Sequence, residues 1–232
     1  MVLLDAPAQA APAWFGKIAC LGDFASRRME ETTVRTLDDW LVAGLGRSRA
    51  LLGARWLDVY LTSPLWRFAL APGVVGAPWW FGILMPSVDS AGRYFPLLAG
   101  QRLASAPSDR TGLDTLEAWY EAIANAALAT LDPASSVDAF EQALAALPML
   151  SADDAVGRQA GPAIGALACG DAAGGASPAQ ALWQAARTEM LHRLKGCSMW
   201  GAWRPGGGTS RVRTVPGLPA PEAFVRLFEG TW

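Results

Sequence analysis

The amino-acid sequence predicts an α/β protein in which a mixed, largely antiparallel central sheet lies between helices, a three-layer α/β/α sandwich. Residues 79–85 are continuously apolar, which is typical of a central strand covered on both faces. Apolar residues recur every three or four positions over 113–131 and again over 137–147, the period of an amphipathic helix. A late hairpin at 198–215 is expected to join the same sheet, because two strands alone are marginally stable in water. Strands followed by helices and a returning hairpin favour helices on both faces of one sheet.

The first elements are a leader, a short strand and a helix. Residues 1–12 are rich in Ala and Pro and are expected to form a loose leader before a single domain at 13–232. Residues 14–19 form a strand candidate that ends in a Gly22-Asp23 turn. A helical pattern over 33–52 follows, with Thr32 or Thr33 as N-cap, Gly53 at its end, and two internal glycines, Gly44 and Gly46, that weaken it.

Alternating apolar residues then predict strands. The first alternation is Leu57, Val59 and Leu61, and the second is Trp66, Phe68 and Leu70. After the run at 79–85, residues 94–101 supply another strand, in which Pro96 indicates an edge position or a strand start.

The second half begins with the two helices at 113–131 and 137–147 and continues through a stretch rich in Gly and Ala. Gly and Ala dominate residues 151–176, which predicts a flexible connection with little packing. A further helix is expected from Ser177 and Pro178 to Leu194. The hairpin then turns around 205–208, and the last helix covers 221–228.

Composition limits the function classes. The chain has 232 residues, of which 52% are hydrophobic and 17% charged, so it can bury a sizeable core. Its eleven Trp residues are expected to be mostly core anchors. The net charge is −2 and no basic run exceeds Arg27-Arg28, which argues against a nucleic-acid-binding face.

The cysteines indicate the compartment, and the longest uncharged stretch tests for a membrane-spanning helix. Three widely spaced cysteines fit reduced thiols in a cytoplasmic protein. Residues 68–88 carry no charge over the length of a membrane-spanning helix, but three prolines interrupt them. We therefore expect buried strands and no membrane insertion.

Motifs for catalysis are weak. The single histidine, His192, lies among basic neighbours and has no nucleophile at suggestive spacing. The glycines at 206–208 have no following Lys, so they do not form a phosphate-binding loop. Metal binding by Asp23, Asp58 and Asp89 is conceivable but matches no known spacing. We expect no enzyme activity, no cofactor and no metal site.

A small set of polar residues in apolar surroundings forms the candidate site. Its members are Asp23, Arg67, Asp89 and Arg93, with the neighbouring aromatic residues Trp66 and Tyr94. One interpretation is structural: Arg67 or Arg93 pairs with Asp23 or Asp89, because an unpaired charge among apolar residues is costly. The other is a recognition surface, since Trp and Arg are enriched in interface hot spots. The two interpretations are compatible.

Several segments carry a family resemblance. They are Trp14-Phe-Gly-Lys-Ile-Ala-Cys-Leu-Gly-Asp-Phe24, the stretch 56–70, Leu84-Met-Pro-Ser-Val-Asp-Ser-Ala-Gly-Arg-Tyr-Phe-Pro-Leu97, Ser198-Met-Trp-Gly-Ala-Trp203 and Gly217-Leu-Pro-Ala-Pro-Glu-Ala-Phe224. In this order they resemble the TagF (ImpM) family of the bacterial type VI secretion system. The resemblance implies the same three-layer fold in a stand-alone, non-catalytic accessory protein. It also implies a post-translational repressor that binds and sequesters a forkhead-associated scaffold protein.

Two other functions remain open at this stage. One is a small-ligand-binding or enzymatic module that uses the Asp/Arg cluster, against which the scarcity of acid–base residues argues. The other is a structural subunit of the secretion baseplate, which copy number in purified baseplates would distinguish from a substoichiometric repressor.

Overall fold

A computed structural model describes residues 2–3, 11–148, 150, 178–203 and 211–232. Most of the predicted leader at 1–12 and all of the predicted connection at 151–176 lie outside the described residues.

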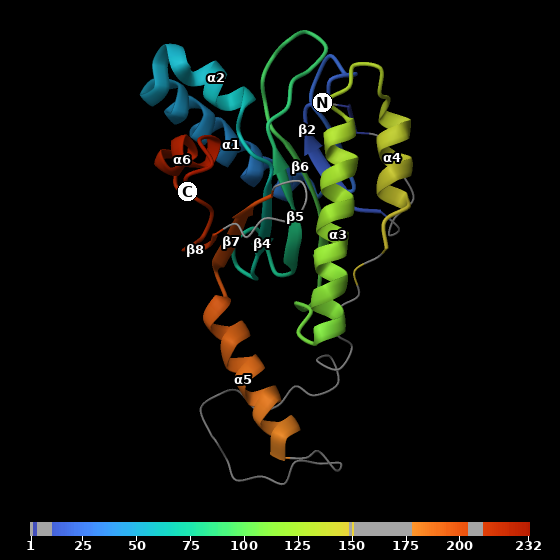
Figure 1. Ribbon diagram of the computed structural model, residues 1–232, viewed down its shortest axis with the longest axis vertical. Helices are drawn as coiled ribbons and strands as arrows, with labels where there is room; N and C mark the ends of the chain where they lie inside the picture. Colours follow the sequence, from blue (N-terminus) through green and yellow to red (C-terminus); the bar gives the residue numbers. More distant parts are fainter. Residues whose placement is uncertain (1, 4–10, 149, 151–177, 204–210) are drawn as a thin grey trace.

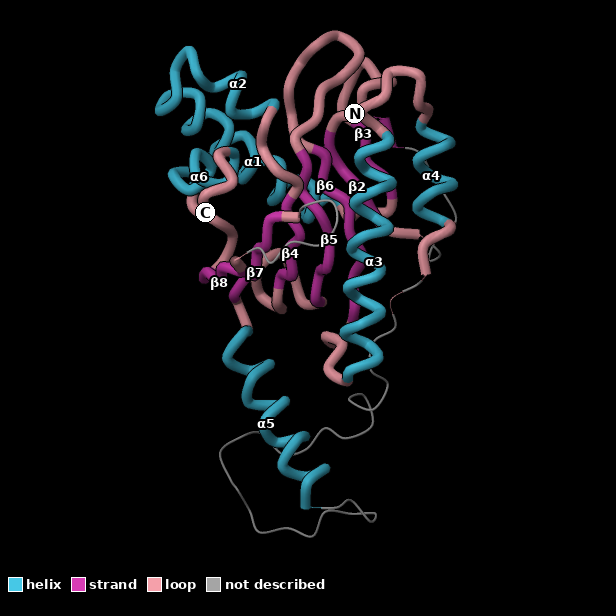
Figure 2. Tube along the Cα trace, viewed as in Figure 1, coloured by secondary structure: helices cyan, strands magenta, loops and turns pink. Residues whose placement is uncertain are grey.

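The described strands form one sheet with the order β1-β3-β2-β6-β5-β4-β7-β8 (Figures 1 and 2). The strands are β1 (Val2–Leu3), β2 (Ala13–Gly16), β3 (Ala25–Arg27), β4 (Trp66–Leu70), β5 (Trp79–Met85), β6 (Leu97–Leu103), β7 (Cys197–Ala202) and β8 (Val212–Pro216). Every neighbouring pair is antiparallel except β1 with β3, which is parallel. The α/β class and the largely antiparallel sheet are thereby confirmed.

Helices lie along both sides of this sheet in Figure 1. They are α1 (Glu31–Leu52), α2 (Trp56–Leu61), α3 (Arg110–Ala129), α4 (Val137–Ala145), α5 (Pro178–Leu194) and α6 (Phe224–Phe228), with short 3-10 helices at Gly53–Arg55 and Pro221–Ala223. Helices α3 and α4 pack in one apolar core, whereas α1, α2 and α6 pack in a second one.

Strand alternation explains the two cores. Along β5, Phe81 and Ile83 belong to the core under α3, while Trp80 and Leu84 belong to the core under α1. All seven residues of β5 are buried, as the continuous apolar run predicts. Strands β5 and β6 lie between other strands, and each contributes residues to both cores, so this part of the sheet is covered from both faces.

The predicted strand at 57–61 is wrong, because Leu57, Val59 and Leu61 belong to helix α2. The buried residues of this segment are Trp56 and Tyr60, which are four positions apart and stack with ring centroids 4.9 Å apart. The buried residues of this segment therefore follow the helical period. The three alternating residues are exposed or only half-buried.

Other boundaries shift for local reasons. Helix α1 begins at Glu31 after Glu30 rather than being capped by Thr32 or Thr33. Strand β2 ends at Gly16, which has a positive φ of 136° that a side chain rarely adopts. Strand β6 begins directly after Pro96 in the interior of the sheet, so this proline marks a strand start rather than an edge.

The two internal glycines of α1 differ in their surroundings, and this gives a paired prediction. A Cβ on Gly44 would lie 2.3 Å from the ring of the fully buried Phe224, whereas a Cβ on Gly46 would meet nothing within 4 Å. We expect Gly44→Ala to lower the free energy of unfolding, since overpacking of about 1–3 kcal/mol exceeds the helix-propensity gain of about 1 kcal/mol. Gly46→Ala should instead raise it by about 1 kcal/mol. Denaturant unfolding of both variants checks the opposite signs, and equal effects would contradict the packing of Phe224 on Gly44.

Candidate functional site

A tight turn between β5 and β6 places Asp89 and Arg93 together. The backbone N–H of Asp89 donates to the carbonyl of Arg93 over 3.1 Å. One carboxylate oxygen of Asp89 accepts from the backbone N–H groups of Ala91 and Arg93, over 3.0 and 2.9 Å. Gly92 supplies the positive φ of 75° that the turn requires. The predicted proximity of Asp89 and Arg93 is confirmed.

The second carboxylate oxygen of Asp89 is shared by two cations. The Lys17 Nζ lies 2.7 Å away and the Arg93 Nε lies 2.8 Å away. Lys17 and Asp89 are both only 3% exposed, whereas the Arg93 side chain is 56% exposed. Burial alone would raise the pKa of Asp89, but the hydrogen bonds from Lys17 and Arg93 hold this pKa well below its usual range. Asp89 is therefore ionised and saturated with donors.

The same network joins a second loop to the first. The Arg93 guanidinium donates to the carbonyl of Gly22, and the Ser90 N–H donates to the carbonyl of Leu21 over 2.9 Å. Asp23 lies on this second loop but is exposed, and it accepts a hydrogen bond from the adjacent Phe24 N–H at 2.8 Å. We call residues 20–24 and 89–93 the paired loops. Their outer surface is exposed at Gly22, Asp23 and residues 90–93.

Tyr94 belongs to the aromatic packing beneath these loops. Its ring contacts those of Trp56 and Tyr60 edge-on, with centroids 6.2 and 5.8 Å apart. The buried Tyr60 hydroxyl donates to the Ser87 carbonyl and accepts from the Ser87 N–H, so it fixes the chain just before the turn. Burial raises the pKa of Tyr60. This tyrosine therefore acts as a neutral hydrogen-bonding group.

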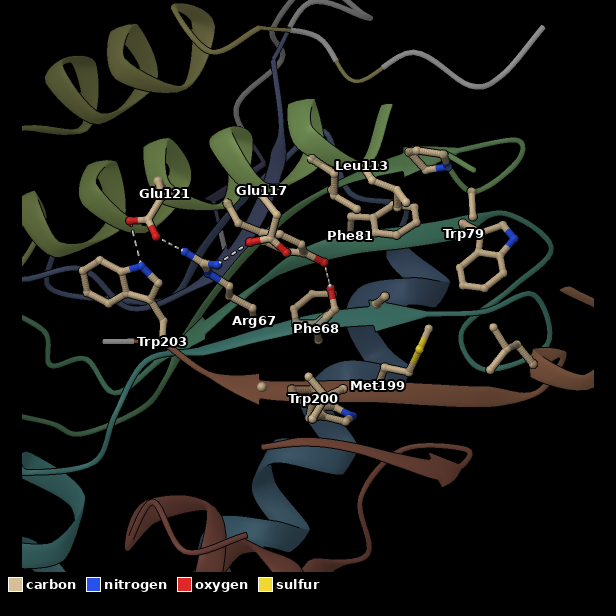
Figure 3. A pocket seen from close by; sticks show the side chains of 18 of the residues that line it. Arg67, Phe68, Trp79, Phe81, Leu113, Glu117, Glu121, Met199, Trp200 and Trp203 are labelled. Atoms are coloured by element: carbon tan, nitrogen blue, oxygen red, sulfur yellow. Dashed lines mark hydrogen bonds and ion pairs between the residues drawn. The ribbon is translucent and has the colours of Figure 1, made fainter. Parts of the chain in front are cut away.

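The structure separates Trp66 and Arg67 from the paired loops. The Trp66 indole N–H donates to the Leu227 carbonyl over 3.0 Å, which ties β4 to α6. The next residue, Arg67, points toward the other core and pairs with Glu117 and Glu121 of α3 instead of with Asp23 or Asp89 (Figure 3). Of the predicted charge pairs, only Arg93 with Asp89 forms.

Arg67 lies at the edge of an apolar cavity of about 600 Å³ between β4, β7, α3 and the end of α5 (Figure 3). Phe68, Phe81, Met199 and Trp203 are among the residues that line it. At the polar end, Glu121 also accepts from the Trp203 indole N–H over 2.9 Å. Arg67 therefore already has two carboxylate partners.

The chain is similar to known proteins in both sequence and structure. A sequence model of the TagF N-terminal domain, described as type VI secretion system-associated, matches residues 13–147. This chain belongs to the TagF family. Its structure is also similar to a crystal structure of PA0076 from Pseudomonas aeruginosa PAO1, with a TM-score of 0.72 and 38% sequence identity over 95% of this chain and 94% of that one. No curated protein sequence matches the chain.

The match to the TagF N-terminal domain includes both the paired loops and Arg67, so the candidate site lies inside the family domain. Within the described part of this TagF chain, no helix is long and apolar enough to cross a membrane. The same residues contain no group of three or more His, Cys, Asp or Glu side chains placed to hold a metal ion.

Sequence reasoning missed Lys17 and the two glutamates that hold Arg67. Lys17 is the only charge between Trp14 and Leu21 in an apolar segment, and this was the available signal for a buried ion pair. Glu117 and Glu121 are four positions apart on a predicted helix, a pattern that is also common on solvated faces. Only the contact between α3 and the sheet distinguishes them.

Proposed function

We propose that this TagF protein is a non-catalytic, cytoplasmic accessory protein of a type VI secretion system. It would act after translation as a repressor, by binding a forkhead-associated scaffold protein and keeping it from the secretion machine. The match of the TagF domain to residues 13–147 is the observation that carries this proposal. The partner and the repression are inferences from the family resemblance. The similarity to a solved protein extends over nearly the full length of the given chain.

The chemistry of the candidate site favours binding over catalysis. Both oxygens of Asp89 already accept hydrogen bonds, so a substrate would have to displace buried ion-pair partners. The Asp/Arg cluster is therefore a poor site for a small ligand. His192 is exposed on α5 and is not one of the residues that line the cavity.

The paired loops are the surface that we propose for the scaffold protein. Binding residues often lie on loops held by a rigid scaffold, because such loops lose little conformational freedom on binding. Here the buried Lys17–Asp89 pair and the bond from Arg93 to Gly22 hold two exposed loops in one arrangement. We also propose that the sheet and its helices form the predicted three-layer α/β/α sandwich, which supports these loops.

The first test is genetic. Deleting the gene should raise type VI secretion, and overproducing the protein should lower it while transcript levels of the system stay constant. Unchanged secretion in a deletion strain with a functioning system would contradict repression. Stoichiometric copies in purified baseplates would instead indicate a structural subunit.

A matched pair of variants tests the paired loops. Asp23 and Asp114 are both exposed carboxylates, but Asp114 lies in the first turns of α3, which follows the end of β6 opposite to the paired loops. We expect Asp23→Lys to weaken binding to the purified forkhead-associated protein at least tenfold, because it reverses a charge at the proposed interface. Asp114→Lys should bind as wild type does, and calorimetric titration measures both. Equal binding by the two variants, with unchanged melting temperatures, would exclude the loop surface.

A further inference from the structure

Strand β8 forms one end of the described sheet, so one of its edges has no neighbouring strand among the described residues (Figures 1 and 2). Residues 211–214 are all exposed. An exposed strand edge presents backbone N–H and C=O groups to which another extended chain can bind. What this edge can bind depends on which of its groups face outward and on the side chains beside them.

Two hydrogen bonds show which backbone groups of β7 face β8. The Ala71 N–H donates to the Cys197 carbonyl over 3.0 Å, so position 197 faces the β4 side. The Gly217 N–H donates to the Gly196 carbonyl over 2.7 Å, so position 196 faces the β8 side. Because the backbone groups of successive residues alternate between the two sides of a strand, the even-numbered positions of β7 bond to β8.

The register of the pair then identifies the free groups of β8. Trp200 lies opposite Arg213, so Arg213 bonds to β7. Its neighbours Val212 and Thr214 therefore direct their N–H and C=O groups away from the sheet. Pro216 also faces outward but has no N–H, so it limits pairing at that end. The outward N–H donors of this edge are thus those of Val212 and Thr214.

The two faces of the edge differ in chemistry. Val212 lines the apolar cavity together with Met199 of β7. On the other face, Arg213 lies over the Trp232 ring, 5.6 Å from its centroid, and Arg211 is two positions away on the same face. Both arginines are exposed, and neither forms an ion pair within the part of the chain that the structure describes. A strand that is apolar on one face and acidic on the other complements both features.

A second copy of this chain fits the edge poorly. Two β8 strands can pair antiparallel through their outward-facing groups with a two-fold axis at position 212, 213 or 214. An axis at 212 or 213 places arginines directly opposite each other, which is destabilising. An axis at 214 places Val212 opposite Pro216, which has no N–H to donate. The occupant that fits is therefore a different protein.

We propose that β8 binds an extended segment of another protein in which acidic and apolar residues alternate. The segment adds an antiparallel strand to the sheet, through main-chain hydrogen bonds to Val212 and Thr214. Its acidic residues lie opposite Arg211 and Arg213, and its apolar residues lie on the cavity face beside Val212. This edge is separate from the paired loops, so the inference goes beyond the function proposed above.

Fluorescence anisotropy with a labelled synthetic peptide tests the proposal on the full chain. The probe is an eight-residue alternation of Glu and Val. The control peptide has the same composition in the repeated order Glu-Glu-Val-Val, which gives an extended strand no apolar face. We expect saturable binding of the probe and at least tenfold weaker binding of the control. Absence of saturable binding, or equal binding of the two peptides, overturns the proposal.

Substitutions in β8 locate the site. Thr214→Pro removes an outward N–H without breaking a bond to β7, and proline is tolerated at such positions of edge strands. We expect it to weaken binding of the probe at least tenfold. Thr214→Val is the matched control, because it keeps the N–H and should bind as wild type does. Wild-type binding by Thr214→Pro overturns the proposal.

A charge exchange provides a second test that does not depend on proline. Arg213→Glu should weaken binding of the Glu-Val probe at least tenfold and should bind an alternating Lys-Val peptide more tightly than wild type does. Failure of this exchange overturns the proposal. So does a dimer of the chain alone that Thr214→Pro dissociates, because β8 would then pair with a second copy. None of these experiments uses the forkhead-associated protein, so its binding to the paired loops succeeds or fails independently.

Discussion

Asp89→Ala is expected to lower the free energy of unfolding by about 3–5 kcal/mol, because it leaves a buried lysine without its counter-charge. Lys17 is only 3% exposed and its ammonium lies 2.7 Å from the Asp89 carboxylate. The substitution also removes the acceptor of two backbone N–H groups in the turn. Denaturant unfolding at neutral pH measures the loss directly.

Arg93→Ala is the control for this prediction. The Arg93 side chain is 56% exposed and leaves the Lys17–Asp89 pair in place when removed. Its loss should cost about 1 kcal/mol, the size of an ordinary hydrogen bond in a solvated setting. If Asp89→Ala kept the wild-type stability and lost only partner binding, the network would be a recognition site and not a structural one.

The pH dependence of the same variant gives an independent check. The pKa of Asp89 is lowered in the folded protein, so its ionised form contributes stability at pH values above the ordinary carboxyl pKa of about 4. That contribution is lost as the pH falls from about 4 through the lower folded value. The stability gap between wild type and Asp89→Ala should therefore narrow in acid. A gap that widened below pH 4 would contradict the assignment.

The sequence predicts the fold where period and burial agree. The run at 79–85 is buried on both sides in β5, and the stripe at 113–131 becomes α3, because both patterns are long and consistent. The prediction of a strand at 57–61 is wrong because three alternating apolar residues fit a strand as well as a short helix. The helical period is carried by Trp56 and Tyr60, which are four positions apart and pack together.

The candidate site was predictable in part. Asp89 and Arg93 are close in sequence around a glycine, so a turn brings them together without knowledge of the tertiary structure. Lys17 is 72 positions from Asp89, and Arg67 is 50 positions from Glu117, so these pairs depend on strand order and helix placement. One sequence can indicate that a buried charge needs a partner, but not which distant residue provides it.

The role of each of the eleven tryptophans also depends on the tertiary structure, because a Trp-rich sequence does not reveal which indoles pack in the core. Trp200 in β7 is 1% exposed and packs against Phe68, Trp40 and Trp232, with ring centroids 5.2, 5.6 and 6.4 Å away. Its indole N–H donates to the Ser198 hydroxyl, which itself donates to the Gly217 carbonyl. The ring therefore joins the sheet to α1 and to the end of the chain.

Trp200→Ala is expected to lower the free energy of unfolding by about 3–5 kcal/mol, because the rings around the indole cannot close the space that it leaves. Trp183→Ala makes the same chemical change at a side chain that is 56% exposed, and should alter stability by less than about 0.5 kcal/mol. Both are measured by denaturant unfolding. A similar loss for the two variants would show that Trp183 is covered within its own chain.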